Sequence, residues 1–354
     1  MSSSFPFFRL PILTQFLILK QLGLLELFYL SLISKRSKHV VKLLNVTLSE
    51  LGWYLVSNVC TVKLTAPNRP GLNSRFRSDG TIETPFERIN VNGMAVPVTR
   101  EPNGSPDCLD IQTISVEESR EVMDKFTEYF LELFKVSKYE VRLPVVPNLR
   151  SWFVWKYTKH FNTVRVRNWH EDGTRLSGRL NSEDVKFLLE ELTIDDALDI
   201  QVLVEEGVRY SGPLKMKELW AGGCLTLEAI LNMDCEKLLF HYTTITYQDL
   251  NTIIKKWLTG GLKNLKHLRL HCTQLPERDS ENTKLDRVLE GIEHFPWDAN
   301  NRPQNAIVDY NTHRYYCNFR NGRDIRRSDG TIATVDFAVN AFVFHIWSHF
   351  SVIQ

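Results

Sequence analysis

Apolar side chains dominate the first 34 residues, but charges and breaks divide them into short stretches. The longest uncharged run covers the ten residues 10–19. A membrane-spanning helix needs about 18–20 apolar residues, so the pattern predicts no membrane anchor. A secretory signal is disfavoured as well, because no positive charge precedes the run and Pro11 lies inside it. A helical domain is the better prediction.

Residues 1–50 predict a bundle of three short helices. Pro11 is placed like a helix-starting proline, and Gly23 separates the first helix from a second one that begins near Leu25. The basic run 35–42 belongs to a third helix. Short apolar helices cannot bury their faces alone. We therefore expect this bundle to leave apolar surface for another protein.

Residues 51–112 have weak periodicity, and six of the fourteen prolines of the chain fall between positions 60 and 110. This composition predicts a loop-rich linker. The hexapeptide Arg77–Ile82 recurs unchanged as Arg327–Ile332. Its Asp-Gly pair favours a tight turn with positive φ, so each copy predicts a β-hairpin.

Residues 113–354 alternate between helical and strand periods. Ser115 and Glu118 have capping-box spacing, and Thr246 precedes the clearest amphipathic helix, which Gly260 ends. Strand-like segments near Leu219, Leu239 and Leu268 are 20 and 29 residues apart, within the range of leucine-rich repeats. Helices between them would cross back over a parallel or mostly parallel sheet. Strand patterns between positions 314 and 347 predict an antiparallel end. The fold class expected is α+β.

Composition narrows the classes of function. Lys and Arg number 43 and Asp and Glu 42, so the net charge of +1 disfavours a global electrostatic grip on nucleic acid or on a membrane. The six cysteines are scattered and form no C-x-x-C pair, which argues against a disulfide scaffold and a cysteine zinc site. We expect reduced thiols and an intracellular protein of the cytoplasm, the nucleus or both.

Residues 150–170 interleave basic and aromatic side chains without an acid. Core strands and a helix with basic outer faces explain this pattern. Binding of single-stranded nucleic acid and binding of a target protein are the alternatives. The candidates for target binding are Trp152, Trp155, Tyr157, Arg165 and Arg167.

No nucleotide-binding, serine-hydrolase or zinc-protease motif is present, and we expect no catalytic residues, no metal and no cofactor. The cluster His170-Glu171-Asp172 predicts a polar turn. His241, His267 and His271 could meet on neighbouring strands, although their spacing does not require zinc. The protein is not expected to be an enzyme.

The segment Phe5–Leu44 resembles an F-box: a Leu-Pro start, an apolar first helix, the second-helix sequence ELFYLSL, and SKRSK before the third helix. The family pattern is not followed at 23–25, where the usual Pro or Asp of the turn is missing. The resemblance implies binding to a Skp-type adaptor and, through it, to a cullin–RING ubiquitin ligase. Carried over by position, the adaptor-facing set is Leu10, Pro11, Leu13, Leu17, Leu22, Leu27, Leu30 and Ser31.

The second half resembles the type 2 F-box-associated domain of a large family expanded in nematodes. The resemblance is carried by 246–251, 256–258, the Leu-Lys-His-Leu strand, 322–334 and the terminal Phe-His-Ile-Trp. It implies an F-box at 1–50 and an F-box-associated domain at 113–354, with the loop-rich linker and its hairpin at 51–112 between them. The function implied is that of a substrate-recognition subunit of a Skp–cullin–F-box ubiquitin ligase, and the alternative is a nucleic-acid-binding protein that uses 150–170.

Overall fold

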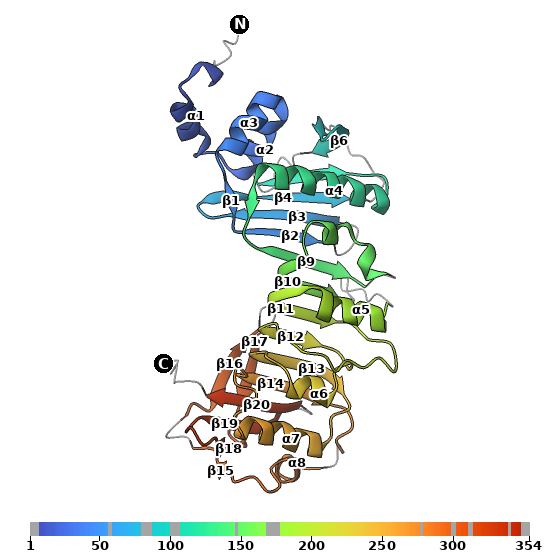
Figure 1. Cartoon of the computed structure of the whole chain (residues 1–354), viewed down its shortest axis with the longest axis vertical. Helices are drawn as coiled ribbons and strands as arrows, with labels where there is room; N and C mark the ends of the chain where they lie inside the picture. Colours follow the sequence, from blue (N-terminus) through green and yellow to red (C-terminus); the bar gives the residue numbers. More distant parts are fainter. Residues whose placement is uncertain are drawn as a thin grey trace. The chain divides into compact units, whose positions relative to one another are not determined.

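A computed structural model describes residues 7–55, 59–78, 87–99, 107–145, 148–167, 178–276, 279–298, 302–310, 314–338 and 341–347. The chain divides into two compact units. The first comprises Met1–Pro144, Ser151–Phe161 and Trp169–Arg175, and the second Val145–Arg150, Asn162–Asn168 and Leu176–Gln354. Each unit combines helices with a β-sheet (Figure 1), so the expected mixed α+β class is confirmed.

The first unit begins with the three helices expected from the sequence. They are preceded by the 3₁₀ turn η1 (Phe7–Arg9) and are α1 (Ile12–Leu19), α2 (Leu24–Ile33) and α3 (Lys35–Leu43). Pro11 precedes α1 and Gly23 precedes α2, neither with a side-chain cap. Ser34 caps α3 by accepting a hydrogen bond from the amide of Ser37 at 3.1 Å, which satisfies a donor that the helix itself leaves unpaired.

The described part of 51–112 consists mainly of strands joined by tight turns, so the loop-rich linker expected there is corrected. The strands of this unit are β1 (Thr47–Leu48), β2 (Glu50–Tyr54), β3 (Val59–Ala66), β4 (Arg69–Arg77), β5 (Glu87–Val91), β6 (Met94–Thr99), β7 (Cys108–Gln112), β8 (Lys135–Val136) and β9 (Tyr139–Pro144). The main sheet has the order β9-β2-β3-β4-β7-β6-β5. Its prolines occupy tolerated places: Pro67 lies in the β3–β4 turn, and Pro97 lies where β6 pairs with β7 only at Val98 and Thr99.

Helix α4 (Val116–Leu133) lies across one face of this sheet (Figure 1). Its apolar side chains, among them Phe126 and Phe130, are buried, and Trp53 of β2 donates a hydrogen bond to Thr127 of α4 at 3.0 Å. The Ser115 cap accepts from the amide of Glu118, as the sequence predicts. Because α4 and β9 belong to the first unit, the division of the chain expected at residue 113 is also wrong.

The second unit contains the parallel strands predicted for its first part. Strands β11 to β14 pair in parallel in chain order, and Leu219, Leu238 and Leu268 lie in register. Three elements lie where the chain passes between the units: the 3₁₀ turn η2 (Leu149–Ser151) ends in the first unit, the 3₁₀ turn η3 (Phe153–Lys156) belongs to the first unit, and β10 (His160–Arg167) starts there. The elements of the second unit up to β14 are α5 (Ser182–Lys186), the π-helical turn η4 (Phe187–Glu191), β11 (Thr193–Gln201), β12 (Glu218–Ala221), α6 (Leu227–Leu231), β13 (Lys237–Thr243), α7 (Tyr247–Leu258) and β14 (His267–Cys272).

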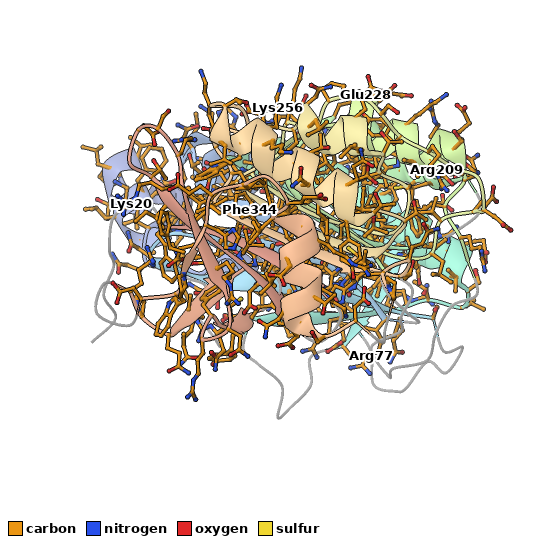
Figure 2. All side chains as sticks on the ribbon, turned by 90° about the horizontal axis from the view of Figure 1, so that it is seen from below. Lys20, Arg77, Arg209, Glu228, Lys256 and Phe344 are labelled. Carbon is orange, nitrogen blue, oxygen red and sulfur yellow. The ribbon has the colours of Figure 1, made fainter. Side chains whose placement is uncertain are left out.

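Helix α7 shows how the sequence specifies this unit. Thr246 and Asp249 form a reciprocal capping box, and the apolar stripe ending at Trp257 is buried. The Trp257 ring meets Phe344 edge to face at a centroid distance of 5.4 Å. Phe344 of β20 is fully buried, whereas Lys256 of α7 points outward (Figure 2). One stripe of α7 therefore packs on the sheet, and the opposite face is polar.

The end of the second unit is antiparallel, as expected. Strand β20 pairs with β14, β19 with β20, and β18 with β19. The remaining elements are α8 (Glu281–Val288), β15 (Phe295–Pro296), the separate hairpin β16 (Asn305–Asp309) and β17 (Arg314–Asn318), β18 (Arg323–Arg326), β19 (Ile332–Ala338) and β20 (Ala341–Trp347). The second hexapeptide copy forms the predicted β18–β19 hairpin, with φ of 89° at Gly330. Positions 79–82 of the first copy lie outside the described residues.

Candidate functional site

Helix α1 carries an exposed apolar face. Leu13 is 73% exposed and Leu17 is 64% exposed, although leucine side chains are usually buried. Ile12 and Ile18 of the same helix extend this face and were not among the residues chosen from the sequence. Their place in the same apolar run was the available signal. In this conformation Gln15 and Leu19 are the side chains of α1 that are buried. We define Ile12, Leu13, Leu17 and Ile18 as the α1 face.

Helix α2 is fixed to the rest of the first unit by an aromatic cluster. Phe28 is fully buried, and its ring centroid lies 5.7 Å from that of Phe126 and 5.3 Å from that of Phe130. Ser31 and Tyr129 share a hydrogen bond of 2.9 Å between their hydroxyl oxygens. The Phe28 ring also meets the ring of Tyr129, so contacts among four aromatic rings join α2 to α4.

Helix α3 adds charged contacts with α4. Lys38 and Lys42 donate to the two carboxylate oxygens of Glu132, at 2.7 and 3.2 Å. The hydrogen bond from Lys38 lowers the pKa of Glu132 most, and the bond from Lys42 adds to this effect. Burial acts in the opposite direction but is outweighed. The Lys38 ammonium also lies 4.0 Å from the centre of the Tyr129 ring. Because such partly exposed pairs contribute little individually, the aromatic cluster is the stronger junction.

The structure sorts the predicted adaptor-facing residues into two groups. Leu27 and Ser31 are buried against the first unit, so they offer no surface to a partner, and their assignment is corrected. The apolar side of α2 packs inside the first unit. The others retain accessible surface: Pro11, Leu13 and Leu17 are exposed, and Leu10, Leu22 and Leu30 are half-buried.

In its described part, residues 150–167, the basic and aromatic segment does not form an open binding platform. Trp152, Trp155 and Arg165 are buried, so the rings cannot stack on bases and the prediction of target contacts at these three residues is corrected. Tyr157 is half-buried and donates a hydrogen bond to a carboxylate oxygen of Asp124 at 2.7 Å.

Arg167 is half-buried as well and pairs with Asp199 at 3.0 Å. The carboxylate of Asp199 is buried, and this burial raises its pKa in spite of the nearby guanidinium. An acid distant in sequence thus pairs with Arg167 of the basic segment. Asp124 and Asp199 could not be predicted as partners from the sequence, because they lie on other elements.

Four histidines of the second unit form two pairs. His241 and His271 stack with ring centroids 4.5 Å apart, and the Nδ1 atoms of His267 and His345 are 3.2 Å apart. Burial lowers the pKa of His345 to about 4, and it also holds the pKa of His267 well below its ordinary value. The short Nδ1–Nδ1 distance suits two neutral rings, one donating and one accepting.

Among the described residues no group of three or more His, Cys, Asp or Glu side chains is placed to hold a metal ion. The expected turn at His170-Glu171-Asp172 lies outside those residues. In the same described part of the chain, no helix has the length and apolar character to cross a bilayer.

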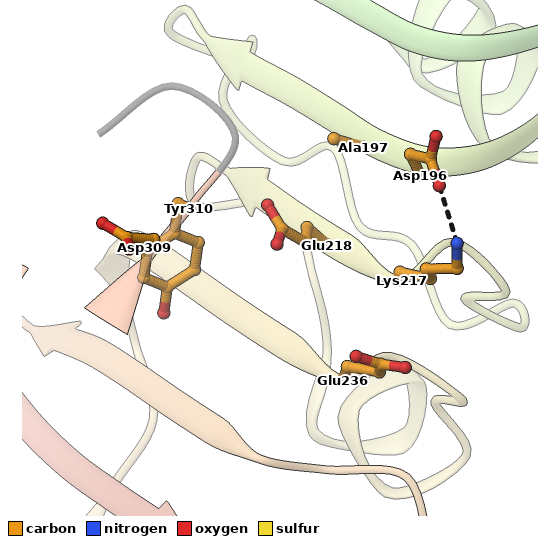
Figure 3. Close-up of a pocket in the computed structure, with 7 residues that line it drawn as sticks. All are labelled: Asp196, Ala197, Lys217, Glu218, Glu236, Asp309 and Tyr310. Carbon is orange, nitrogen blue, oxygen red and sulfur yellow. Dashed lines mark hydrogen bonds and ion pairs between the residues drawn. The ribbon is translucent and has the colours of Figure 1, made fainter. Parts of the chain in front are cut away.

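A pocket of about 340 Å³ lies at the start of strands β12 and β13 (Figure 3). Its lining is Asp196, Ala197, Lys217, Glu218, Glu236, Asp309 and Tyr310. Lysines pair with three of the carboxylates: Lys217 with Asp196 at 2.7 Å, Lys237 with Glu218 at 2.7 Å and Lys266 with Glu236 at 2.6 Å. Each lysine thus forms an ion pair with a carboxylate that lies at or beside the preceding strand of the sheet. This arrangement fits cross-strand ion pairing, and the lining residues include no nucleophile with a neighbouring base.

Two regions of the chain match models of known protein families. Residues 7–49, which hold α1 to α3, match the family model described as the F-box domain. Residues 213–270, which hold β12, β13 and most of β14, match the model described as F-box associated. The chain carries an F-box and an F-box-associated domain. The α1 face therefore belongs to the F-box, and the strand series β12–β14 belongs to the F-box-associated domain.

One curated relative of the chain is an uncharacterized F-box protein of Caenorhabditis elegans. It is 30% identical over 112 residues, which are 31% of this chain and 25% of the relative. The chain thus matches about a quarter of that relative's length. No solved structure matches the chain.

Proposed function

We propose that this F-box protein is a substrate-recognition subunit of a Skp–cullin–F-box type ubiquitin ligase. The α1 face would bind a Skp-type adaptor, and the second unit would hold a target protein. The observation that carries the proposal is the exposure of Leu13 and Leu17, at 73% and 64%, on the first helix of an F-box. Leaving two leucines in water forgoes about 1.5–3 kcal/mol each, and a partner that covers them recovers this free energy.

The proposed mechanism is tethering, without an active site in this chain. Two binding events on one chain raise the effective concentration of the target near a ubiquitin-charged enzyme elsewhere in the ligase. The target's lysines would then react by proximity. The repeat-like series β12–β14 of the F-box-associated domain is the part of the second unit that we infer to support target binding.

The test is a binding titration with a purified Skp-type adaptor. Replacing Leu13 and Leu17 together by aspartate should weaken binding at least about 100-fold, because two anchors are lost and charge is placed in the interface. Leu203→Asp is the matched control, since Leu203 is 46% exposed on the second unit. All variants should keep the wild-type melting temperature within a few degrees. Equal binding by the double variant, or no adaptor binding by the wild type, would refute the proposal.

A further inference from the structure

Helix α1 has little support of its own. It comprises eight residues, of which Gln15 and Leu19 are buried. Isolated helices shorter than about 12–15 residues are marginal in water. The helix that presents the α1 face must therefore be held by the neighbouring parts of the first unit.

The end of α1 is held by an arginine from outside the F-box. The Nη1 atom of Arg69, at the start of β4, donates to the carbonyl oxygen of Leu22 at 2.8 Å and to that of Leu19 at 3.2 Å. The last carbonyl groups of a helix lack partners within the helix. A guanidinium is well suited to them, because it brings fixed donors and a positive charge to the negative end of the helix dipole.

The β3–β4 hairpin brings Arg69 to this position. Its strands are joined by the two residues Pro67 and Asn68, with φ of 61° at Asn68, and Ala66 pairs with Arg69. The next residue, Pro70, touches the turn between α1 and α2. A Cβ atom at Gly23 would lie 3.3 Å from the Cβ of Pro70, so glycine permits this close approach. The same glycine stands where the F-box pattern usually has another turn residue.

A second arginine holds the start of the α1 region. Arg36 of α3 donates to the carbonyl oxygen of Phe8 at 3.2 Å, and its guanidinium lies 4.9 Å from the centre of the Phe8 ring. Phe8 belongs to η1, which Leu10 and Pro11 connect to α1, so the chain is contacted both before and after this helix. Neither contact covers Leu13 or Leu17, which remain exposed.

We propose that Arg69 is a positioning residue for adaptor binding. It fixes the direction of α1 relative to the first unit, so that the α1 face is presented in one orientation. This inference rests on the proposed adaptor function. The observed dissociation constant equals the intrinsic one divided by the fraction of molecules in the competent conformation. If loss of Arg69 leaves about a tenth of the molecules with α1 in place, adaptor binding weakens about 10-fold.

The experiment compares Arg69→Ala, Arg69→Lys and Arg75→Ala in the full-length chain. Arg75 is the matched control, because it is a half-buried cation of the same strand about 20 Å further along. Hydrogen exchange of residues 12–19 is measured without adaptor, and the dissociation constant is measured with a purified Skp-type adaptor. Peptides of α4 report whether the first unit remains folded.

We expect Arg69→Ala to speed exchange of 12–19 about 10-fold and to weaken adaptor binding by a similar factor, with α4 unchanged. Arg69→Lys should lie between Arg69→Ala and the wild type, because an ammonium keeps the charge without the planar fork. Arg69→Lys also keeps the inference testable if Arg69→Ala does not fold. Unchanged exchange of 12–19, or faster exchange with undiminished adaptor binding, would overturn the inference. If the wild type does not bind the adaptor, the proposed function fails, whereas the exchange comparison still decides whether Arg69 holds α1.

Discussion

Replacing Phe28 by alanine is expected to lower the free energy of unfolding of the first unit by about 3–5 kcal/mol. Phe28 is fully buried, and its ring contacts Phe126, Tyr129 and Phe130 of α4. The substitution removes the ring and leaves a cavity at the junction between the F-box and the sheet that follows it. Native-state hydrogen exchange of α4 amides measures the loss, because α4 belongs to the same unit.

Leu13→Ala is the control for Phe28→Ala. Leu13 lies in the same F-box but is 73% exposed, so its truncation should change stability by less than about 0.5 kcal/mol. If Phe28→Ala affects exchange only in residues 24–43 and leaves α4 unchanged, the F-box folds as a separate module. The description of one compact first unit would then be wrong.

Replacing Arg302 by methionine should destabilise the second unit by about 3–5 kcal/mol at pH 7. Arg302 and Asp324 form an ion pair in which both side chains are about 95% buried. Asp324 also accepts a hydrogen bond from Thr334 at 2.7 Å. Without the guanidinium, an uncompensated carboxylate remains in the interior. Urea denaturation, monitored through hydrogen exchange of the β19 amides, measures this loss of stability.

The loss caused by Arg302→Met should shrink as the pH falls. Burial raises the pKa of Asp324 even with Arg302 present, and removing the cation raises it further. The folded variant therefore binds a proton at a higher pH than the unfolded chain, so its stability decreases as pH rises. Adding Asp324→Leu should restore most of the stability at pH 7, since no buried charge is left.

Arg326→Met is the comparison for Arg302→Met, because Arg326 is an exposed cation of the same strand as Asp324. Its effect should stay within about 0.5 kcal/mol. A deficit of Arg302→Met that is small, or that is the same at pH 5 and pH 7, would contradict the role assigned to the buried pair.

Local signals in the sequence identified the elements that depend on neighbouring residues. The positions of Pro11 and Gly23 predicted the breaks between the N-terminal helices, and the Thr246 cap predicted the start of α7. The second Asp-Gly pair predicted the β18–β19 hairpin. In each case the determining contacts lie within a few residues, where spacing and turn chemistry are informative.

Features that depend on distant contacts could not be predicted. The prolines of 51–112 indicated loops, but the parallel partners β7 and β9 complete a sheet there. The pattern could not show that Leu27 packs inside the unit whereas Leu17 stays exposed, since both lie on apolar helices. Arg69 was invisible as a contact of α1, because 47 residues separate it from Leu22.

The most direct test is hydrogen exchange of this chain with and without a purified Skp-type adaptor. Bound adaptor is expected to protect residues 12–19 and to leave the exchange of α4 and of residues 24–33 as slow as in the free protein. Protection elsewhere with none at 12–19 would contradict it. Faster exchange of α4 on binding would contradict it as well, because the adaptor would then separate α2 from α4.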